Sequence, residues 1–363
     1  MKQTQPTKKT MTNNNCFFER NLYMKRHRQN LAPLLQLARL SIIFSIVLPL
    51  RLHASGQDST AQADEKNEIS PPKVTGYAQI NYLQFLKEPS KDKASGFNIN
   101  RVRFAFEGEI IPGRVEYAVE FDPQGSPILD DTYLDYIFND KARMRVGRYK
   151  IPFGAENPTG EDELNFIEKS KIVENVFSPR EVGVGTLFDM LRFSGDVGYF
   201  QKAEEQRIER DVIGHLGVMP FGKVMDIGVS GYYEHVSTDT TKFALNRYGV
   251  DGTFLLGPIE AQGEIIWSKG TLEDKSVDAF GYFAYILYTH TVHKIPVTWG
   301  VRYEYFDPNR HDNHDHELKY VGGTTIQFHP RMRMQINYQR ITQALPGKDD
   351  TQNKIIAQYQ FSF

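Results

Sequence analysis

The sequence predicts an all-β fold, a transmembrane up-and-down antiparallel β-barrel of about 16 strands. Three observations lead to this prediction: the alternation of the last strand, the recurrence of strand-length runs, and the regular change between short and long connections. A membrane strand turns successive side chains to opposite faces, so one face can meet lipid while the other meets water. The low mean hydropathy of −0.48 is therefore compatible with this fold.

Residues 353–363 show the alternation most clearly. One face carries Ile355, Ala357, Tyr359, Phe361 and Phe363, and the other carries Lys354, Gln358, Gln360 and Ser362, with Ile356 as the exception. A terminal strand that ends on Phe resembles the closing strand of bacterial outer-membrane barrels, where the aromatic terminus is an assembly signal. The alternative is an ordinary edge strand that ends a soluble domain.

The N-terminal region is predicted to be a cleaved signal peptide with an upstream extension, residues 1–54. Basic residues follow Met24, which is an alternative start to Met1, and the apolar run 40–50 is too short to cross a bilayer. Residues 55–72 form a polar periplasmic linker in this interpretation, and residues 73–363 form the barrel. Cys16 lies in the extension, so the exported chain has no cysteine.

The charge balance disfavours a nucleic-acid partner. Residues 55–363 carry 34 Lys or Arg and 44 Asp or Glu, a net charge of −10 with neutral His. Binding to a nucleic-acid backbone needs clustered positive charge, and a net negative charge disfavours it.

Strand-length runs recur along the whole of the predicted barrel. The clear ones are residues 74–87, 97–111, 114–122, 128–139, 142–153, 209–220, 224–238, 247–257, 259–270, 276–293, 295–307, 316–329, 332–342 and 353–363, and 181–189 and 190–202 are weaker. Short connections such as 112–113 and 257–258 alternate with longer polar ones such as 87–97 and 307–316. Short periplasmic turns and longer external loops are typical of single-chain membrane barrels.

The polar face of these strands is predicted to point inward. Arg101, Arg103, Glu107 and Glu109 share one face, and Asp135 opposes Leu134 and Tyr136 in the same way. A Lys or Arg in the hydrocarbon costs about 2–4 kcal/mol, so the charged face lines the lumen. Such a lining needs water, or pairing between neighbours such as Arg103 and Glu116. A barrel of about sixteen strands is wide enough for an aqueous channel.

The longest connection, residues 153–181, is the third external loop in this arrangement. We predict a short helix near Glu161–Lys171 and expect the loop to fold into the lumen and narrow it. An exposed loop in solvent is the alternative.

Residues 145–184 resemble the phosphate-selective porin O and P family. The segments that carry the resemblance are Arg145–Gly154 (RVGRYKIPFG), Phe166–Ser170 (FIEKS) and Pro179–Gly183 (PREVG). The resemblance implies a trimeric outer-membrane channel for small hydrophilic solutes, with anion-attracting basic residues in the lumen and third loop and no cofactor. Lys150, Lys169 and Arg180 match basic positions of the family motifs. Periodicity adds Arg101, Arg103, Arg143 and Arg145 as lumen candidates, and Asp135 shares their wall.

Solute preference stays open between oxyanions such as phosphate and a weakly selective pore. Arginine suits phosphate through its rigid fork of donors. Against this, acidic residues share the wall with the arginines, and the net charge is negative.

Other residues and other functions offer alternatives to a porin channel. An external run with His311, His314 and His316 could bind a metal, although a solvated polar loop is the commoner outcome. Glu161–Glu163 could hold divalent ions against lipopolysaccharide, or they could form a solvated acidic patch. Lipopolysaccharide and outer-membrane lipid are the expected neighbours of the barrel. An outer-membrane barrel enzyme of phospholipase or protease type and a channel-less adhesin or anchor are the alternatives to a channel. No serine lies in a segment that resembles those enzymes.

Overall fold

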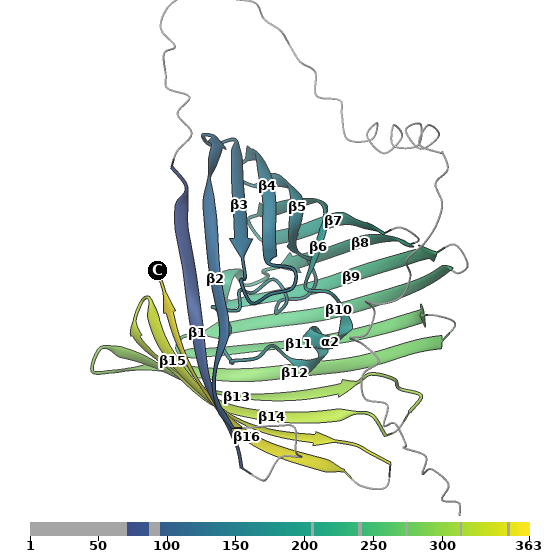
Figure 1. Ribbon diagram of the computed structural model, residues 1–363. Helices are drawn as coiled ribbons and strands as arrows, with labels where there is room; N and C mark the ends of the chain where they lie inside the picture. Colours follow the sequence, from purple (N-terminus) through teal and green to yellow (C-terminus); the bar gives the residue numbers. More distant parts are fainter. Residues whose placement is uncertain are drawn as a thin grey trace, which may run out of the picture. The chain divides into compact units, whose positions relative to one another are not determined.

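The structure, a computed structural model, describes residues 71–86, 95–204, 207–238, 242–272, 275–312, 314–346 and 349–363. Sixteen strands in these residues close into one antiparallel barrel, in which each strand pairs with its neighbours in the chain and β1 pairs with β16 (Figure 1). The predicted fold is confirmed. The predicted signal peptide, and the linker up to residue 70, lie outside the described residues.

The strand bounds agree with the predicted runs to within a few residues at most ends. The strands are β1 (Lys73–Phe85), β2 (Gly96–Ile111), β3 (Val115–Phe121), β4 (Leu129–Asn139), β5 (Ala142–Lys150), β6 (Arg180–Met190), β7 (Phe193–Glu204), β8 (Arg207–Val218), β9 (Met225–Thr238), β10 (Lys242–Leu256), β11 (Ile259–Leu272), β12 (Lys275–Val292), β13 (Ile295–Asp307), β14 (Glu317–His329), β15 (Met332–Gln343) and β16 (Asp350–Ser362). A helix, α2 (Lys171–Val176), and a short 3-10 turn, η2 (Gly222–Val224), complete the list. In the described part of the chain no helix is both long and apolar enough to cross a membrane.

The connections alternate in length as predicted. Tight turns join β2 to β3 and β10 to β11, where Gly113 and Gly257 adopt φ of 65° and 57° that favour glycine. At the other end β5 and β6 are joined by residues 151–179, the third loop of that end, which we call L3.

The two faces of the strands separate as expected. In β13, Val301 is 63% exposed on the outward face, whereas Arg302 next to it is 3% exposed on the inward face. In β16, Phe361 is exposed outward while Gln358 and Gln360 are buried inward. The single exception in the terminal alternation, Ile356, is 3% exposed and points into the barrel.

The inward face is only partly the polar lining that the sequence predicts. A buried apolar cluster includes Phe200, Ile266 and Phe283 from the wall together with Phe166 and Ile172 from L3. The predicted sorting of polar side chains to the inward face and apolar side chains to the outward face therefore does not hold in this sector. Burial of these side chains between L3 and the wall removes apolar surface from water and stabilises the loop inside the barrel.

The helix of L3 begins where the prediction ends it. The predicted span was Glu161–Lys171, but these residues form turns, and α2 covers Lys171–Val176. The reason is that wall side chains bind the loop carbonyls that a helix would use: Gln79 Nε2 donates to Glu161 O, and Gln335 Nε2 donates to Leu164 O, both at 3.1 Å. The helix packs against β12 and β13, and Figure 1 shows it beside the ribbon of β12.

Candidate functional site

L3 lies inside the barrel and contacts wall strands on several sides. At its start the Gly154 amide donates to Ser230 Oγ of β9 at 2.8 Å. Further along, the Ile167 amide donates to Asn337 Oδ1 of β15 at 2.9 Å. The expectation that this loop folds into the lumen agrees with these contacts.

Gly154 is required by the close approach of L3 to the wall. Its φ is 67°, and a Cβ at this position would overlap the Glu264 carboxylate. Glu264 in turn accepts hydrogen bonds from the Ala155 and Glu156 amides, each at 3.3 Å. The glycine of the PFG segment therefore permits the first turn of L3 against β11.

Glu161 of L3 is the centre of an ionic cluster. Its carboxylate lies 2.7 Å from the Arg103 guanidinium of β2 and 3.4 Å from Lys150 Nζ of β5. Lys169 Nζ and an Arg180 nitrogen lie at 3.8 and 3.9 Å. Burial opposes ionisation of Glu161, but the four positive charges outweigh burial and hold the pKa of Glu161 well below its usual range.

Wall carboxylates complete this cluster. Arg103 also pairs with Glu120 at 3.1 Å and with Asp130 at 2.8 Å. Arg180 pairs with Asp131 at 2.8 Å and with Glu120 at 3.3 Å. Each cluster arginine is therefore neutralised by more than one carboxylate.

A second anchor holds L3 to the strands on the other side of β1. Glu168 lies 2.9 Å from Lys354 Nζ of β16 and 3.2 Å from Lys319 Nζ of β14, and it accepts from Gln339 Nε2 at 3.0 Å. Burial raises the pKa of this carboxyl, but the two ammonium groups prevail and lower it to about 2.

The Lys169 ammonium group has a pKa that is lowered toward neutral pH. Its Nζ donates to the Asn157 carbonyl at 2.8 Å and is nearly buried. Burial and the neighbouring Lys150 lower the pKa of Lys169 to about 8, although Glu161 opposes the shift.

The predicted site residues fall into three places. Arg103, Lys150, Lys169 and Arg180 meet at Glu161, as described above. Arg145 forms a bidentate pair with Asp135, at 2.7 and 2.8 Å, and Arg143 reaches the same carboxylate at 3.4 Å. Arg101 lies apart, and within the described residues its side chain forms no hydrogen bond or ion pair.

The suggested pairing of Arg103 with Glu116 is wrong. The β2–β3 register places Glu109 opposite Glu116 and Phe104 opposite Phe121, so Arg103 meets the end of β3 and the residues beyond it. The tight turn at residues 112–113 sets this register and keeps Glu116 close to the turn, and the bulge between Glu109 and Ile111 moves the pairing by only one residue.

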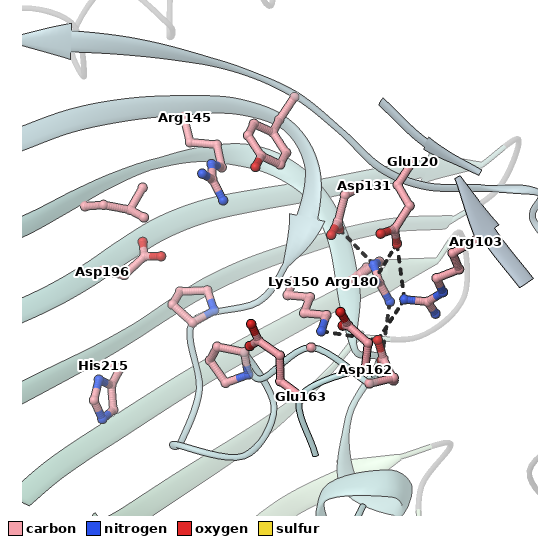
Figure 2. Close-up of a pocket in the computed structure, with 16 residues that line it drawn as sticks. Arg103, Glu120, Asp131, Arg145, Lys150, Asp162, Glu163, Arg180, Asp196 and His215 are labelled. Carbon is pink, nitrogen blue, oxygen red and sulfur yellow. Dashed lines mark hydrogen bonds and ion pairs between the residues drawn. The ribbon is translucent and has the colours of Figure 1, made fainter. Parts of the chain in front are cut away.

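Two cavities lie on either side of this part of L3. The turn-side cavity, about 550 Å³, has six lining carboxylates (Glu120, Asp131, Glu161, Asp162, Glu163, Asp196) against four cations (Arg103, Arg145, Lys150, Arg180) and His215. Figure 2 shows Arg103, Lys150 and Arg180 gathered with Glu120 and Asp131 on one side, with Asp196 and His215 on the other. Asp162 and Glu163 form no ion pair with any described residue.

The loop-side cavity, about 470 Å³, has the opposite balance. Its charged lining consists of five cations (Arg101, Lys169, Lys171, Lys319, Lys354) and four carboxylates (Glu161, Glu168, Glu174, Glu317). Glu161 lines both cavities.

The sequence analysis missed the residues that organise the site. The acidic run with Glu161 was read as a lipopolysaccharide contact or a solvated patch, but Glu161 is 7% exposed and lies inside the barrel. Glu168 was named only within a family motif. One signal could have predicted their role. Both carboxylates lie in a loop that is expected to enter a lumen with basic side chains, where an acidic residue would pair with them.

A metal centre finds no support in the described part of the chain, where no group of three or more His, Cys, Asp or Glu is arranged to hold an ion. His311 approaches Asp278 at 3.7 Å and His314 approaches Asp312 at 3.6 Å, so these histidines face different carboxylates.

Solved porin structures share this fold. The anion-selective porin of Comamonas acidovorans superposes with a TM-score of 0.62 at 11% identity, over 82% of this chain and all of that chain. OmpT of Vibrio cholerae, in a trimer form, superposes with a TM-score of 0.60 at 11% identity, over 80% of this chain and 99% of that chain. OprB of Pseudomonas putida superposes with a TM-score of 0.54 at 10% identity, over 82% of this chain and 94% of that chain. No curated protein sequence matches the chain.

The class of protein follows from the barrel together with the family comparison: this is a channel of the porin type in the bacterial outer membrane. Residues 73–242, from the start of β1 to the start of β10, match the family of phosphate-selective porins O and P. The resemblance seen in residues 145–184 is thereby confirmed. The family and the fold are those of a channel rather than an enzyme.

Proposed function

We propose that this porin lets small hydrophilic solutes diffuse passively through the barrel with weak charge selectivity, the long loops facing outward. The observation that supports this proposal best is the pairing of the lumen cations. Arg103, Arg180, Lys150 and Lys169 all face Glu161, and Arg145 is bound to Asp135. Cations neutralised in this way attract free anions less than the number of basic residues suggests.

An oxyanion such as phosphate is the second candidate. The excess of cations in the loop-side cavity supports it, in particular Arg101, which lacks a partner among the described residues. The family name points to phosphate, and one similar structure is titled an anion-selective porin. In this case Arg101, Arg103, Arg143, Arg145, Lys150, Lys169 and Arg180 would contact anions, with Asp135 as their counter-charge.

We further propose a homotrimer surrounded by outer-membrane lipid and lipopolysaccharide, without enzymatic activity or cofactor. The trimer form of OmpT supports the oligomeric state. The outward apolar face, with side chains such as Val301 and Trp299 exposed, suits lipid contact.

Single-channel recording of the refolded barrel in a KCl gradient tests these proposals. A pore with weak selectivity produces conductance steps with a reversal potential near zero that added phosphate does not block. Steps that phosphate blocks, with an anion-selective reversal potential, would favour the oxyanion candidate. A folded barrel without conductance steps would contradict the channel.

A further inference from the structure

A furrow runs along the outward face of β12–β15. Its lining includes Ile286 of β12, Val301 of β13, Gly322 of β14 and Tyr338 of β15, and its volume is about 550 Å³. The space where a Cβ of Gly322 would lie is open, with no atom within 4 Å. On the outward face of a membrane barrel this apolar furrow meets lipid, and its apolar lining suits an acyl chain.

A row of aromatic rings lies next to the furrow, toward the long-loop end. Tyr320, Tyr303 and Tyr282 follow one another at centroid distances of 5.0 and 5.9 Å. Phe280 lies 6.0 Å beyond Tyr282, and Trp267 lies 5.7 Å beyond Phe280. Aromatic residues in such a position mark the level of the lipid headgroups.

Two arginines flank this row, one beside Tyr320 and one over Phe280. Arg340 of β15 pairs in register with Tyr320, is exposed, and forms no hydrogen bond or ion pair within the described residues. Arg310 lies over the Phe280 ring at 5.9 Å, and its half-exposed side chain is 3.6 Å from Asp278.

At the Arg310 end of the row, the Asp307 carboxylate accepts hydrogen bonds from neighbouring groups. Asp307 lines the cavity beside Arg310, and its carboxylate accepts from the Tyr305 hydroxyl and the Asn309 amide, each at 3.1 Å. The end of the row at Arg340 therefore presents the less compensated positive charge.

We propose that this surface is a binding site for a phosphate-bearing lipid of the outer leaflet. One acyl chain occupies the furrow at Gly322, and the phosphate groups contact Arg340 and Arg310, with the headgroup against the aromatic row. The proposal rests on the outward orientation of the long loops proposed above. Its ligand is separate from any solute of the lumen.

Native mass spectrometry of the purified barrel with lipid A tests the proposal. We expect retained lipid A, and at least tenfold weaker binding in Gly322→Leu and in the double variant Arg310→Ala/Arg340→Ala. The matched controls are Gly231→Leu, an outward glycine that also has no atom within 4 Å of its Cβ position, and Arg331→Ala at the turn end. Both controls retain binding.

Two results would overturn the site. One is equal binding of lipid A and dephosphorylated lipid A, and the other is equal binding by Gly322→Leu and Gly231→Leu. Conductance of the same four variants keeps the two proposals apart, since all five substituted positions lie outside the lumen. Loss of lipid binding with unchanged conductance supports the lipid site, and absence of conductance in the unaltered chain bears on the porin function alone.

Discussion

The carboxylate of Glu161 and the guanidinium of Arg103 lie 2.7 Å apart although 58 residues separate them in the chain. The pair joins L3 to β2, and its carboxylate lines both lumen cavities. We therefore expect the charge selectivity of the pore to depend on this contact between the loop and the wall rather than on either alone.

Replacing Glu161 with Gln should shift the pore toward anions. The change removes the negative charge that faces Arg103, Lys150, Lys169 and Arg180, while the amide keeps a similar shape. A change of about 1 kcal/mol in the electrostatic energy of a monovalent ion alters its permeability about fivefold, in opposite directions for anions and cations. Reversal potentials in a KCl gradient measure the permeability ratio, and Glu109→Gln near the turn end is the control. An unchanged ratio would show that the Glu161 carboxylate does not control permeation.

Arg145→Ala should destabilise the barrel more than Arg143→Ala. Asp135 is 1% exposed, and Arg145 is its bidentate partner, so removal of Arg145 leaves a buried charge with only the longer contact to Arg143. Breaking a buried pair costs about 3–5 kcal/mol, whereas exposed pairs contribute about 0–1 kcal/mol. Unfolding in urea, followed by the heat-dependent gel shift, measures the difference. Equal stability of the two variants would contradict the assignment.

Phe166→Ala should loosen L3 without opening the barrel. Phe166 is 2% exposed, lies 5.7 Å from the Tyr285 ring and lies under the Arg302 guanidinium at 4.8 Å. Loss of a buried Phe costs about 3–5 kcal/mol. We expect larger and noisier conductance with normal barrel folding, and no change in the outward control Phe138→Ala. Unaltered conductance would mean that L3 docking does not depend on this side chain.

Acid should release L3 below about pH 4.5. The folded-state pKa of Glu168 is lowered to about 2, so its contribution is complete above the ordinary carboxyl pKa and is lost as pH falls toward 2. The lowered pKa of Glu161 acts in the same direction. Channel noise should rise over this window, and Glu168→Gln should show the increase already at neutral pH. The same acid profile in this variant and in the unaltered chain would exclude Glu168 as the anchor.

Alkali should make the pore more cation-selective between about pH 7 and 9. The pKa of Lys169 is lowered to about 8, so its positive charge is lost as pH rises through this value. Reversal potentials across this range report the change. Lys169→Met should remove the pH dependence, and a dependence that persists in this variant would assign it to another group.

The sequence by itself determined the barrel. A side-chain period of two is a local property, so residues 353–363 and the other strands reveal which face meets lipid and how many strands there are. The motifs of residues 145–184 likewise identified the family and located the loop that enters the lumen.

Only the tertiary structure decided which partners the charged residues of the lumen have. Arg103 meets Glu161 rather than Glu116, Glu168 reaches Lys354 across 186 residues, and Phe200 and Phe283 face L3 instead of water. These contacts depend on hairpin register, on closure of the barrel and on the path of L3. None of the three leaves a periodic signal in the chain, because the pairing of distant groups is set by the folded geometry and not by local spacing.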